Sequence, residues 1–182
     1  MDRSERLLRL LPGQVISHSQ LLENGFSKED VAALSASLRI FPTPFKGVYY
    51  VPMPEEREGW FIDKPLRVLS MAMGLFLEGE EFYYSCESAE EALGIRWRPS
   101  GRVHVVNEKI SGRVNLKERI MRNLGKGTYR AKKIARLLSF YGNEIVFHRT
   151  RSMGKNKVKH TPYGSFAVKS QIRKDRKKFG EE

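Results

Sequence analysis

The side chains that could carry out chemistry in this sequence are few and widely spaced. The segment Gly125-Lys126-Gly127-Thr128 is similar to the end of a phosphate-binding loop, but it lacks the first glycine of that motif and follows a helical pattern. No Gly-x-Ser-x-Gly elbow for a nucleophilic serine occurs. The aspartates are too dispersed to predict a carboxylate pair for two-metal chemistry; they are Asp2, Asp30, Asp63 and Asp175.

Histidine and cysteine offer a weaker alternative. His104 and His148 both fall in segments that read as strands and could be neighbours, but no cysteine or suitably spaced carboxylate accompanies them in the sequence, so a structural role is favoured. The single cysteine, Cys86, excludes an internal disulfide and a cysteine-rich zinc site, and it is typical of a reducing compartment. We therefore expect a protein that is not an enzyme, without catalytic residues, metal or cofactor.

Positive charge is the stronger signal because it is concentrated in one part of the chain. The 182 residues carry a net charge of +12 at pH 7. Residues 1–60 contain 7 Lys and Arg against 8 Asp and Glu, residues 61–110 contain 6 against 8, and residues 111–182 contain 20 against 5. Such a one-sided field favours a polyanion, and nucleic acid is a commoner partner of a cytosolic protein than an anionic membrane. A solubilising tail is the alternative interpretation.

The N-terminal elements that would position a DNA-binding surface begin with two short helices. Ser4–Leu11 has the pattern of an amphipathic, leucine-rich helix. Ser17 is placed as the N-cap of a second helix over His18–Asn24, and Gly25 is a natural residue to end it.

A third helix is predicted to start at Ser27-Lys28-Glu29-Asp30, which resembles a capping box with Asp in the Glu position. Its apolar residues share one face and should pack on the first two helices; they are Val31, Leu34 and Leu38. Two strands follow, Arg39–Phe41 and Val48–Val51, joined by a turn that contains Pro and Gly. Three helices and a hairpin predict a winged helix-turn-helix over residues 1–53.

The remaining chain predicts a domain of mixed α+β type. Residues 54–62 are acidic and read as a linker, residues 63–150 alternate helical and strand patterns, and residues 151–182 form a basic C-terminal extension. Two helical segments, 116–126 and 129–141, combine an apolar stripe with a basic face. In the first of them the stripe is Leu116, Ile120 and Leu124. The expected fold class is therefore α+β, with the winged helix at the N-terminus.

The residues expected to contact DNA fall into two groups. In the winged helix they are Ser27, Lys28, Ser37, Arg39 and Lys46. In the basic C-terminal region they are Arg119, Arg122, Lys126, Lys132, Lys133 and Arg136. The outer face of the third helix carries Glu29 and alanines instead of the Arg, Asn or Gln that usually read bases, so most contacts should be to phosphates. Neutralising roughly six phosphates would give a log–log salt slope of about −5.

The chain has no pattern that predicts export or membrane insertion. Its first residues are charged and lack the apolar core of a secretory signal, so the cytoplasm is the expected location. The longest apolar run, Leu66–Leu77, falls short of the roughly 18 residues that a bilayer span needs, so no membrane partner is expected. The oligomeric state stays open.

Several segments resemble a known family. The stretch from Gly13 to Val51, with Leu21-Leu22-Glu23-Asn24-Gly25-Phe26-Ser27 and Phe45-Lys46-Gly47-Val48-Tyr49, resembles the N-terminal winged helix of the AbiEi-like antitoxins, which are transcriptional regulators of type IV toxin–antitoxin operons. Phe82-Tyr83-Tyr84-Ser85 followed by Ser88-Ala89-Glu90-Glu91-Ala92-Leu93-Gly94 is similar to the opening of their second domain. Thr161-Pro162-Tyr163-Gly164 resembles a later segment.

This resemblance implies operator binding through the winged helix, negative autoregulation, and a second domain that helps to neutralise a nucleotidyltransferase toxin. It places DNA-contacting positions on the third helix and wing, among them Lys28, Ser37, Arg39 and Lys46. We therefore expect a DNA-binding transcriptional regulator with duplex DNA as its partner and a cognate toxin as a further candidate partner. The alternatives are a protein-interaction module that neutralises a toxin and an RNA- or ribosome-associated protein.

Overall fold

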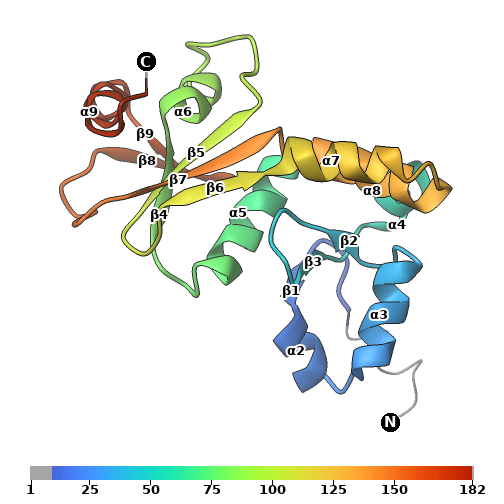
Figure 1. Cartoon of the computed structure of the whole chain (residues 1–182). Helices are drawn as coiled ribbons and strands as arrows, with labels where there is room; N and C mark the ends of the chain where they lie inside the picture. The colour runs from blue at the N-terminus through green and yellow to red at the C-terminus, as the bar shows by residue number, and fades with distance from the viewer. Residues whose placement is uncertain (1–9, 182) are drawn as a thin grey trace. The chain divides into compact units, whose positions relative to one another are not determined.

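The computed structural model describes residues 10–181 and divides them into two compact units (Figure 1). Unit 1 contains the described residues up to Phe76 together with Arg119–Tyr141, and unit 2 contains Leu77–Glu118 and the described residues from Gly142 onward. Over this range the chain forms eight helices and two sheets, so the mixed α+β class is confirmed. The predicted helix Ser4–Leu11 lies outside the described residues except for its last two positions.

Unit 1 begins with a strand, two helices and a hairpin. These are β1 (Val15–Ser17), α2 (His18–Glu23), α3 (Lys28–Ala36), β2 (Phe41–Pro42) and β3 (Val48–Tyr50). Both predicted helix starts are confirmed, because Ser17 and Ser27 are the N-caps of complete capping boxes. In each box the N3 side chain, Gln20 or Asp30, accepts a hydrogen bond from the N–H of the N-cap residue. Gly25 follows α2 with a φ of 86°, which favours glycine.

The three strands of unit 1 form an antiparallel sheet in the order β1-β3-β2. Val31 and Leu34 of α3 point inward as predicted, and they pack with Leu21 of α2 and also with residues in and next to the strands. The resulting core contains Ile16, Leu21, Phe26, Val31, Leu34, Ile40 and Val51. The strand predicted over Arg39–Phe41 begins only at Phe41. The residues before it end α3: Leu38 has a φ of 51°, and Arg39 N donates a hydrogen bond to Leu34 O at 2.9 Å.

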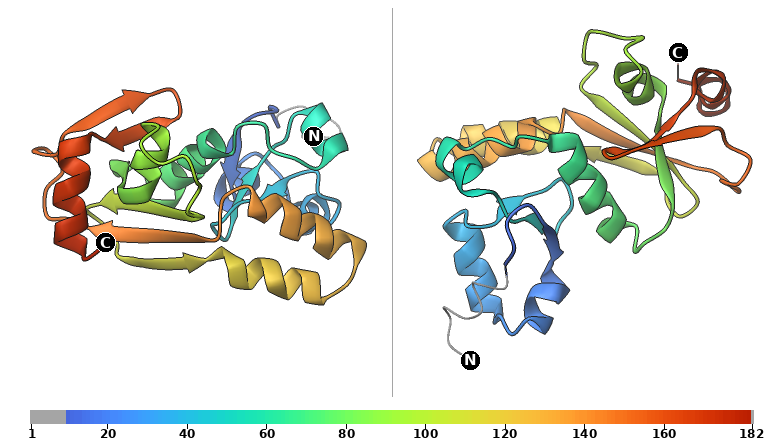
Figure 2. Two further views of the ribbon diagram at one scale, coloured as in Figure 1. Left: turned by 90° about the horizontal axis from the view of Figure 1, so that it is seen from above. Right: turned by 180° about the vertical axis from the view of Figure 1, so that it is seen from behind.

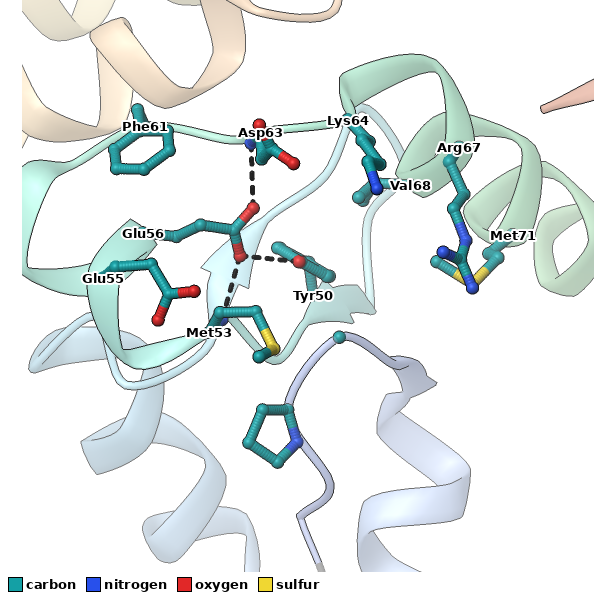
Figure 3. Close-up of a pocket in the computed structure, with 12 residues that line it drawn as sticks. Tyr50, Met53, Glu55, Glu56, Phe61, Asp63, Lys64, Arg67, Val68 and Met71 are labelled. Atoms are coloured by element: carbon teal, nitrogen blue, oxygen red, sulfur yellow. Dashed lines mark hydrogen bonds between the residues drawn. The ribbon is translucent and has the colours of Figure 1, made fainter. Parts of the chain in front are cut away.

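Residues 54–62, predicted to be a linker, contain helix α4 (Pro54–Gly59). The carboxylate of Glu56 is buried beneath it and accepts hydrogen bonds from the Tyr50 hydroxyl at 2.6 Å and from two backbone N–H groups at 2.8 Å (Figure 3). Burying a carboxylate is costly unless its oxygens are hydrogen bonded in this way. Glu56, one of the acidic residues that suggested a linker, therefore holds the backbone around it in place.

Three further helices complete unit 1, namely α5 (Pro65–Phe76), α7 (Leu116–Gly125) and α8 (Tyr129–Ser139). Helix α5 begins at Pro65, a residue type that is favoured in the first turn of a helix, and α7 passes from unit 2 into unit 1 after Glu118. Thr128 caps α8 by accepting a hydrogen bond from Ala131 N at 3.2 Å. Within residues 10–181, each helix is either too short or too polar to traverse a lipid bilayer.

Unit 2 is built on a mixed six-stranded sheet in the order β6-β7-β5-β4-β9-β8. The strands are β4 (Phe82–Ser85), β5 (Arg102–Asn107), β6 (Gly112–Asn115), β7 (Glu144–Arg149), β8 (Val158–Thr161) and β9 (Gly164–Ala167). Helices α6 (Cys86–Ala92) and α9 (Lys169–Phe179) lie side by side on one face of this sheet (Figures 1 and 2).

Residues 151–182, predicted to be a basic extension, supply β8, β9 and α9 to this unit. The parallel pairing of β9 with β4 and the packing of α9 on the sheet make this segment part of the fold. The physical reason is a buried stripe along α9, formed by Gln171, Ile172 and Asp175, which the many lysines of the helix obscure in the sequence. The domain boundaries therefore differ from those expected at residues 63–150 and 151–182.

The Asp175 carboxylate is the polar anchor of α9, and its replacement tests this packing. It accepts hydrogen bonds from the Ser85 hydroxyl at 2.6 Å, the Gln171 amide at 2.8 Å and the Tyr83 hydroxyl at 3.0 Å. Asp175→Ala leaves buried donors without an acceptor, so we expect the free energy of unfolding to fall by about 3 kcal/mol. Urea denaturation measures this change. Lys174→Ala, at the exposed neighbouring position, should change stability by less than about 0.5 kcal/mol; equal effects of the two substitutions would contradict the anchor.

Candidate nucleic-acid interface

Helix α3 presents a polar and small-residue face to solvent. Val31 and Leu34 point into the core, whereas Lys28, Ala32, Ala33 and Ala36 are exposed. The two serines expected to contact DNA flank this helix, and both have structural roles. Ser27 is the N-cap, and the Ser37 hydroxyl donates a hydrogen bond to Ala33 O at 2.8 Å. Of the contacts expected on this helix, Lys28 is therefore the charged one, and its side chain is exposed to solvent.

The turn between β2 and β3 is fixed from within and exposes one lysine at its tip. The buried Thr43 hydroxyl donates to Val48 O at 2.8 Å, and the Phe45 ring stacks on Phe76 with 4.3 Å between ring centroids. Lys46 is exposed, and Arg39 is exposed at the start of the hairpin. Lys46 thus projects from a turn that internal contacts hold in place, and Arg39 lies just before β2.

Two arginines attach the α7–α8 hairpin to these N-terminal elements within unit 1. Arg119 is half-buried and its Nη1 donates to Pro44 O in the turn at 2.5 Å. Burial lowers the pKa of Arg119, and the nearby Arg122 lowers it further. Arg130 donates from Nε to Ala36 O at 2.9 Å, at the C-terminal end of α3. The basic hairpin, the turn and the end of α3 are therefore contiguous.

Lys133 is held by two aromatic rings. Its Nζ lies 3.4 Å from the centroid of Trp60 and 4.0 Å from the centroid of Tyr129, and the residue is half-buried. A cation between two ring faces is stabilised by their quadrupoles. Lys133, expected to contact phosphate, therefore has a structural partner that the sequence did not reveal, because Trp60 lies 73 positions away.

The other expected contacts of this hairpin lie at the surface. They are Arg122, Lys126, Lys132 and Arg136, all of them exposed. The apolar stripe predicted for α7 is confirmed at Leu116, which is fully buried, and is wrong at Leu124, which is 46% exposed. The half-buried residues of α7 instead include Arg119, which reaches the turn, whereas Leu124 lies in the exposed last turn of the helix.

Unit 2 carries a second group of cations that the residue-level prediction missed. On α9 the exposed ones are Lys169, Arg173, Lys174, Lys177 and Lys178. Before α9, along β7, β8 and the loop between them, they are Arg149, Arg151, Lys155, Lys157 and Lys159. The charge count pointed to this region, but only the folded helix separates the exposed lysines from the buried stripe.

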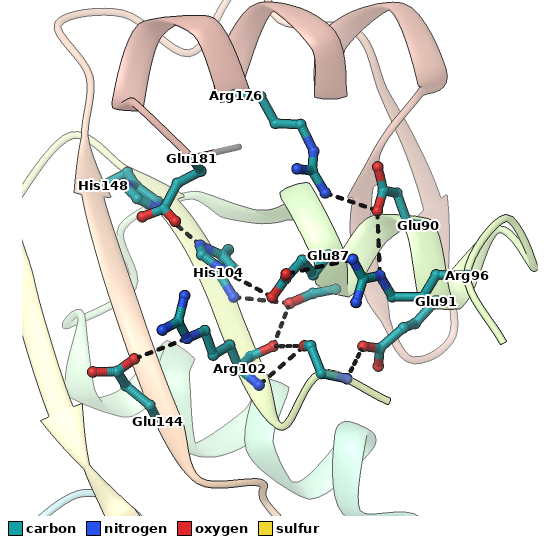
Figure 4. A network of polar contacts seen from close by, with 12 residues as sticks. Glu87, Glu90, Glu91, Arg96, Arg102, His104, Glu144, His148, Arg176 and Glu181 are labelled. Carbon is teal, nitrogen blue, oxygen red and sulfur yellow. Dashed lines mark hydrogen bonds and ion pairs between the residues drawn. The ribbon is translucent and has the colours of Figure 1, made fainter. Parts of the chain in front are cut away.

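A buried polar network occupies the face of the unit 2 sheet under α6 and α9 (Figure 4). His104 on β5 and His148 on β7 are neighbours, as considered from the sequence, with His104 Nδ1 and His148 Nε2 3.0 Å apart. Glu87 Oε2 lies 3.6 Å from His104 Nε2. Arg176 on α9 binds the Glu90 carboxylate of α6 at 2.9 Å. Glu87 was missed because nothing in the sequence indicates that α6 packs beside the strand that carries His104.

Burial favours the neutral forms of His104, His148 and Cys86. Burial and, to a smaller extent, the adjacent His104 lower the pKa of His148 to about 4. Burial also lowers the pKa of His104, against the carboxylates of Glu181 and Glu87, which raise it. Burial raises the pKa of the Cys86 thiol to about 12. A thiol that stays protonated is a poor nucleophile, so this environment disfavours covalent catalysis at Cys86.

Comparison of the chain with protein-family models, curated proteins and solved structures finds no match.

Substituting the two neighbouring lysines of α8 separates a structural from a surface role. Lys133→Ala removes the cation between Trp60 and Tyr129, so we expect the free energy of unfolding to fall by about 1 kcal/mol. Lys132→Ala, at an exposed position in the same turn, should be nearly neutral. Thermal unfolding followed by tryptophan fluorescence measures both. A neutral Lys133→Ala variant would show that the aromatic contact contributes nothing to the fold.

Proposed function

We propose that this protein binds duplex DNA as a transcriptional regulator. One observation carries the proposal: the exposed face of α3, the β2–β3 turn and the basic α7–α8 hairpin belong to one compact unit and contact one another through Arg119 and Arg130. A helix that can enter a groove, a turn that can reach the backbone and a set of exposed cations are thereby combined. These are the components that duplex recognition requires.

Within this proposal, β1 to β3 with α2 and α3 act as a winged helix. Helix α3 is the recognition helix and the β2–β3 turn, with Lys46 at its tip, is the wing. The element order and the β1-β3-β2 sheet support this reading. The alanines of α3 permit close approach to the duplex and offer few hydrogen bonds to bases, so sequence preference comes from fit and from a small number of contacts.

The exposed cations supply the affinity. In unit 1, those among the expected contacts are Lys28, Arg39, Lys46, Arg122, Lys126, Lys132 and Arg136. Each phosphate that they neutralise releases counterions, which makes binding strongly dependent on salt. The basic surface of α9 gives unit 2 a phosphate-binding role of its own.

The resemblance to AbiEi-like antitoxins suggests an operator as the DNA and a toxin as a protein partner. A protein partner is the second candidate function, and exposed apolar residues in the loop after α6 favour it; they are Leu93, Ile95 and Trp97, the last being 87% exposed. Such residues are enriched where proteins bind one another. The signature of this function is a complex with a second protein that persists at salt concentrations that release DNA.

The salt dependence of DNA binding tests the role of α8. In fluorescence anisotropy titrations with duplex DNA from upstream of the protein's own gene, Lys132→Ala/Arg136→Ala should reduce the log–log salt slope by about 2, because two phosphate contacts are lost. The matched control is Lys64→Ala/Arg67→Ala, which removes the same charge from a cavity that Glu55 and Asp63 also line (Figure 3). Equal slopes for both variants would contradict the assignment.

A negative charge on the outer face of α3 tests whether this helix enters the duplex. Ala33 is exposed, so Ala33→Glu should leave the fold intact while placing a carboxylate against DNA. We expect the affinity for the same duplex to fall by about tenfold or more, through desolvation and repulsion of the new charge. Ala92→Glu, at an exposed position on α6, is the control. If both variants bind as the unaltered protein does, α3 is not the recognition helix.

A further inference from the structure

Three side chains of the kinds that bind transition metals meet in the interior of unit 2. Cys86 and His104 are 0% exposed and His148 is 8% exposed. One potential ligand atom from each of the three lies within 4.8 Å of those of the other two. Thiolate and imidazole are the ligands that Zn²⁺ and other borderline-soft cations prefer.

The sheet brings these residues together from distant parts of the chain. In the parallel pair β5–β7, His104 lies opposite Val146, and His148 is two residues further along, so both imidazoles are on the same face. Ser85 lies opposite His104 in the β4–β5 pair, and Cys86 is the next residue. Cys86 has a φ of 49°, a left-handed conformation that is uncommon for a residue other than glycine. Backbone strain of this kind tends to occur at functional sites.

The two imidazoles point straight at each other. His104 Nδ1 and His148 Nε2 are 3.0 Å apart, the rings are inclined by 3°, and the 5.3 Å between their centroids is the separation that two such rings reach end to end. In the metal-free chain, one nitrogen therefore donates a proton to the other. On the far side of the ring, His104 Nε2 and Glu87 Oε2 are buried 3.6 Å apart, and both atoms lack a hydrogen-bond partner among the described residues.

We propose that Cys86 Sγ, His104 Nδ1 and His148 Nε2 bind one Zn²⁺ ion, with the Glu181 carboxylate as the fourth ligand. Glu181 Oε1 lies 4.0 Å from His148 Nε2, on the side from which the C-terminal end of α9 approaches (Figure 4). An oxygen donor in the fourth position fits tetrahedral Zn²⁺ better than copper, whose Cys-His-His sites carry a weak axial thioether. With Zn–N distances of about 2.0–2.1 Å, the two nitrogens separate from 3.0 Å to about 3.4 Å and both rings tilt.

Binding follows a defined proton balance. The Cys86 thiol loses its proton to solvent as the Zn–S bond forms. If His104 carries the shared proton, it leaves Nδ1 for solvent and another proton is taken up at Nε2, so the ring stays neutral. The Nε2–H group then donates to Glu87 Oε2, and the unpartnered pair becomes the carboxylate–histidine arrangement that orients metal ligands. One proton is released for each ion bound.

Cobalt provides the spectroscopic test. The full-length protein, freed of metal with a chelator, is titrated with Co²⁺, and we expect one ion per chain with tetrahedral d–d bands and a thiolate-to-cobalt charge-transfer band. Zn²⁺ should displace the cobalt and raise the thermal midpoint. Cys86→Ser should abolish the charge-transfer band, and Glu87→Gln should weaken Zn²⁺ binding by about tenfold to hundredfold. His160→Asn, which alters an exposed histidine of the same unit, should change nothing.

The titration of the unaltered protein decides the question even if a variant folds poorly. Absence of the charge-transfer band together with an unchanged thermal midpoint in Zn²⁺ would overturn the proposal and leave His104 and His148 as a structural hydrogen-bonded pair. A band retained in Cys86→Ser would overturn the assignment of the thiolate ligand.

Discussion

The arrangement of unit 1 depends on arginine side chains that donate to backbone carbonyls. Arg119 binds Pro44 O in the β2–β3 turn, and Arg130 binds Ala36 O at the end of α3. The carbonyls at a helix C-terminus have no partner within the helix and carry partial negative charge, so a guanidinium is well suited to them. These contacts hold the basic hairpin within residues 119–141 against elements that precede residue 50 in the sequence.

This use of charge divides the cations of α7 and α8 into two kinds. Arg119, Arg130 and Lys133 are engaged with carbonyls or aromatic rings, which makes them part of the scaffold. Lys132 and Arg136 are exposed and keep their long-range field. Helix α3 adds little charge of its own, and its alanines provide shape more than hydrogen bonding. In the proposed function, affinity and fit are therefore supplied by different elements of one unit: exposed cations attract the duplex, and the shape of α3 determines how it fits.

Local signals were recovered from the sequence, and pairings between distant segments were not. The capping boxes at Ser17 and Ser27 and the start of α5 at Pro65 were predictable because each depends on residues within one helical turn. The β1 strand and the place of α9 depend on partners far along the chain, so composition misled at residues 151–182. It also misled at residues 54–62, because composition does not show that the backbone folds around the Glu56 carboxylate. At the candidate interface the residue types were identifiable, but whether a lysine faces solvent or an aromatic ring, as for Lys133 and Trp60, is decided by tertiary packing.

Helix α9 connects the buried histidines of unit 2 to its basic surface. Phe179, near the end of α9, stacks on His148 with 4.4 Å between centroids, and Arg176 of α9 pairs with Glu90. The exposed lysines of α9 present a defined surface only while this helix is held on the sheet. An ion bound by Cys86, His104, His148 and Glu181 would join the end of α9 to the start of α6 and to strands β5 and β7, and so stabilise the cationic surface. By linkage, a polyanion that binds the ordered helix would raise the affinity for the metal by the same factor. The metal site would then control how much of the positive charge of unit 2 is available for binding.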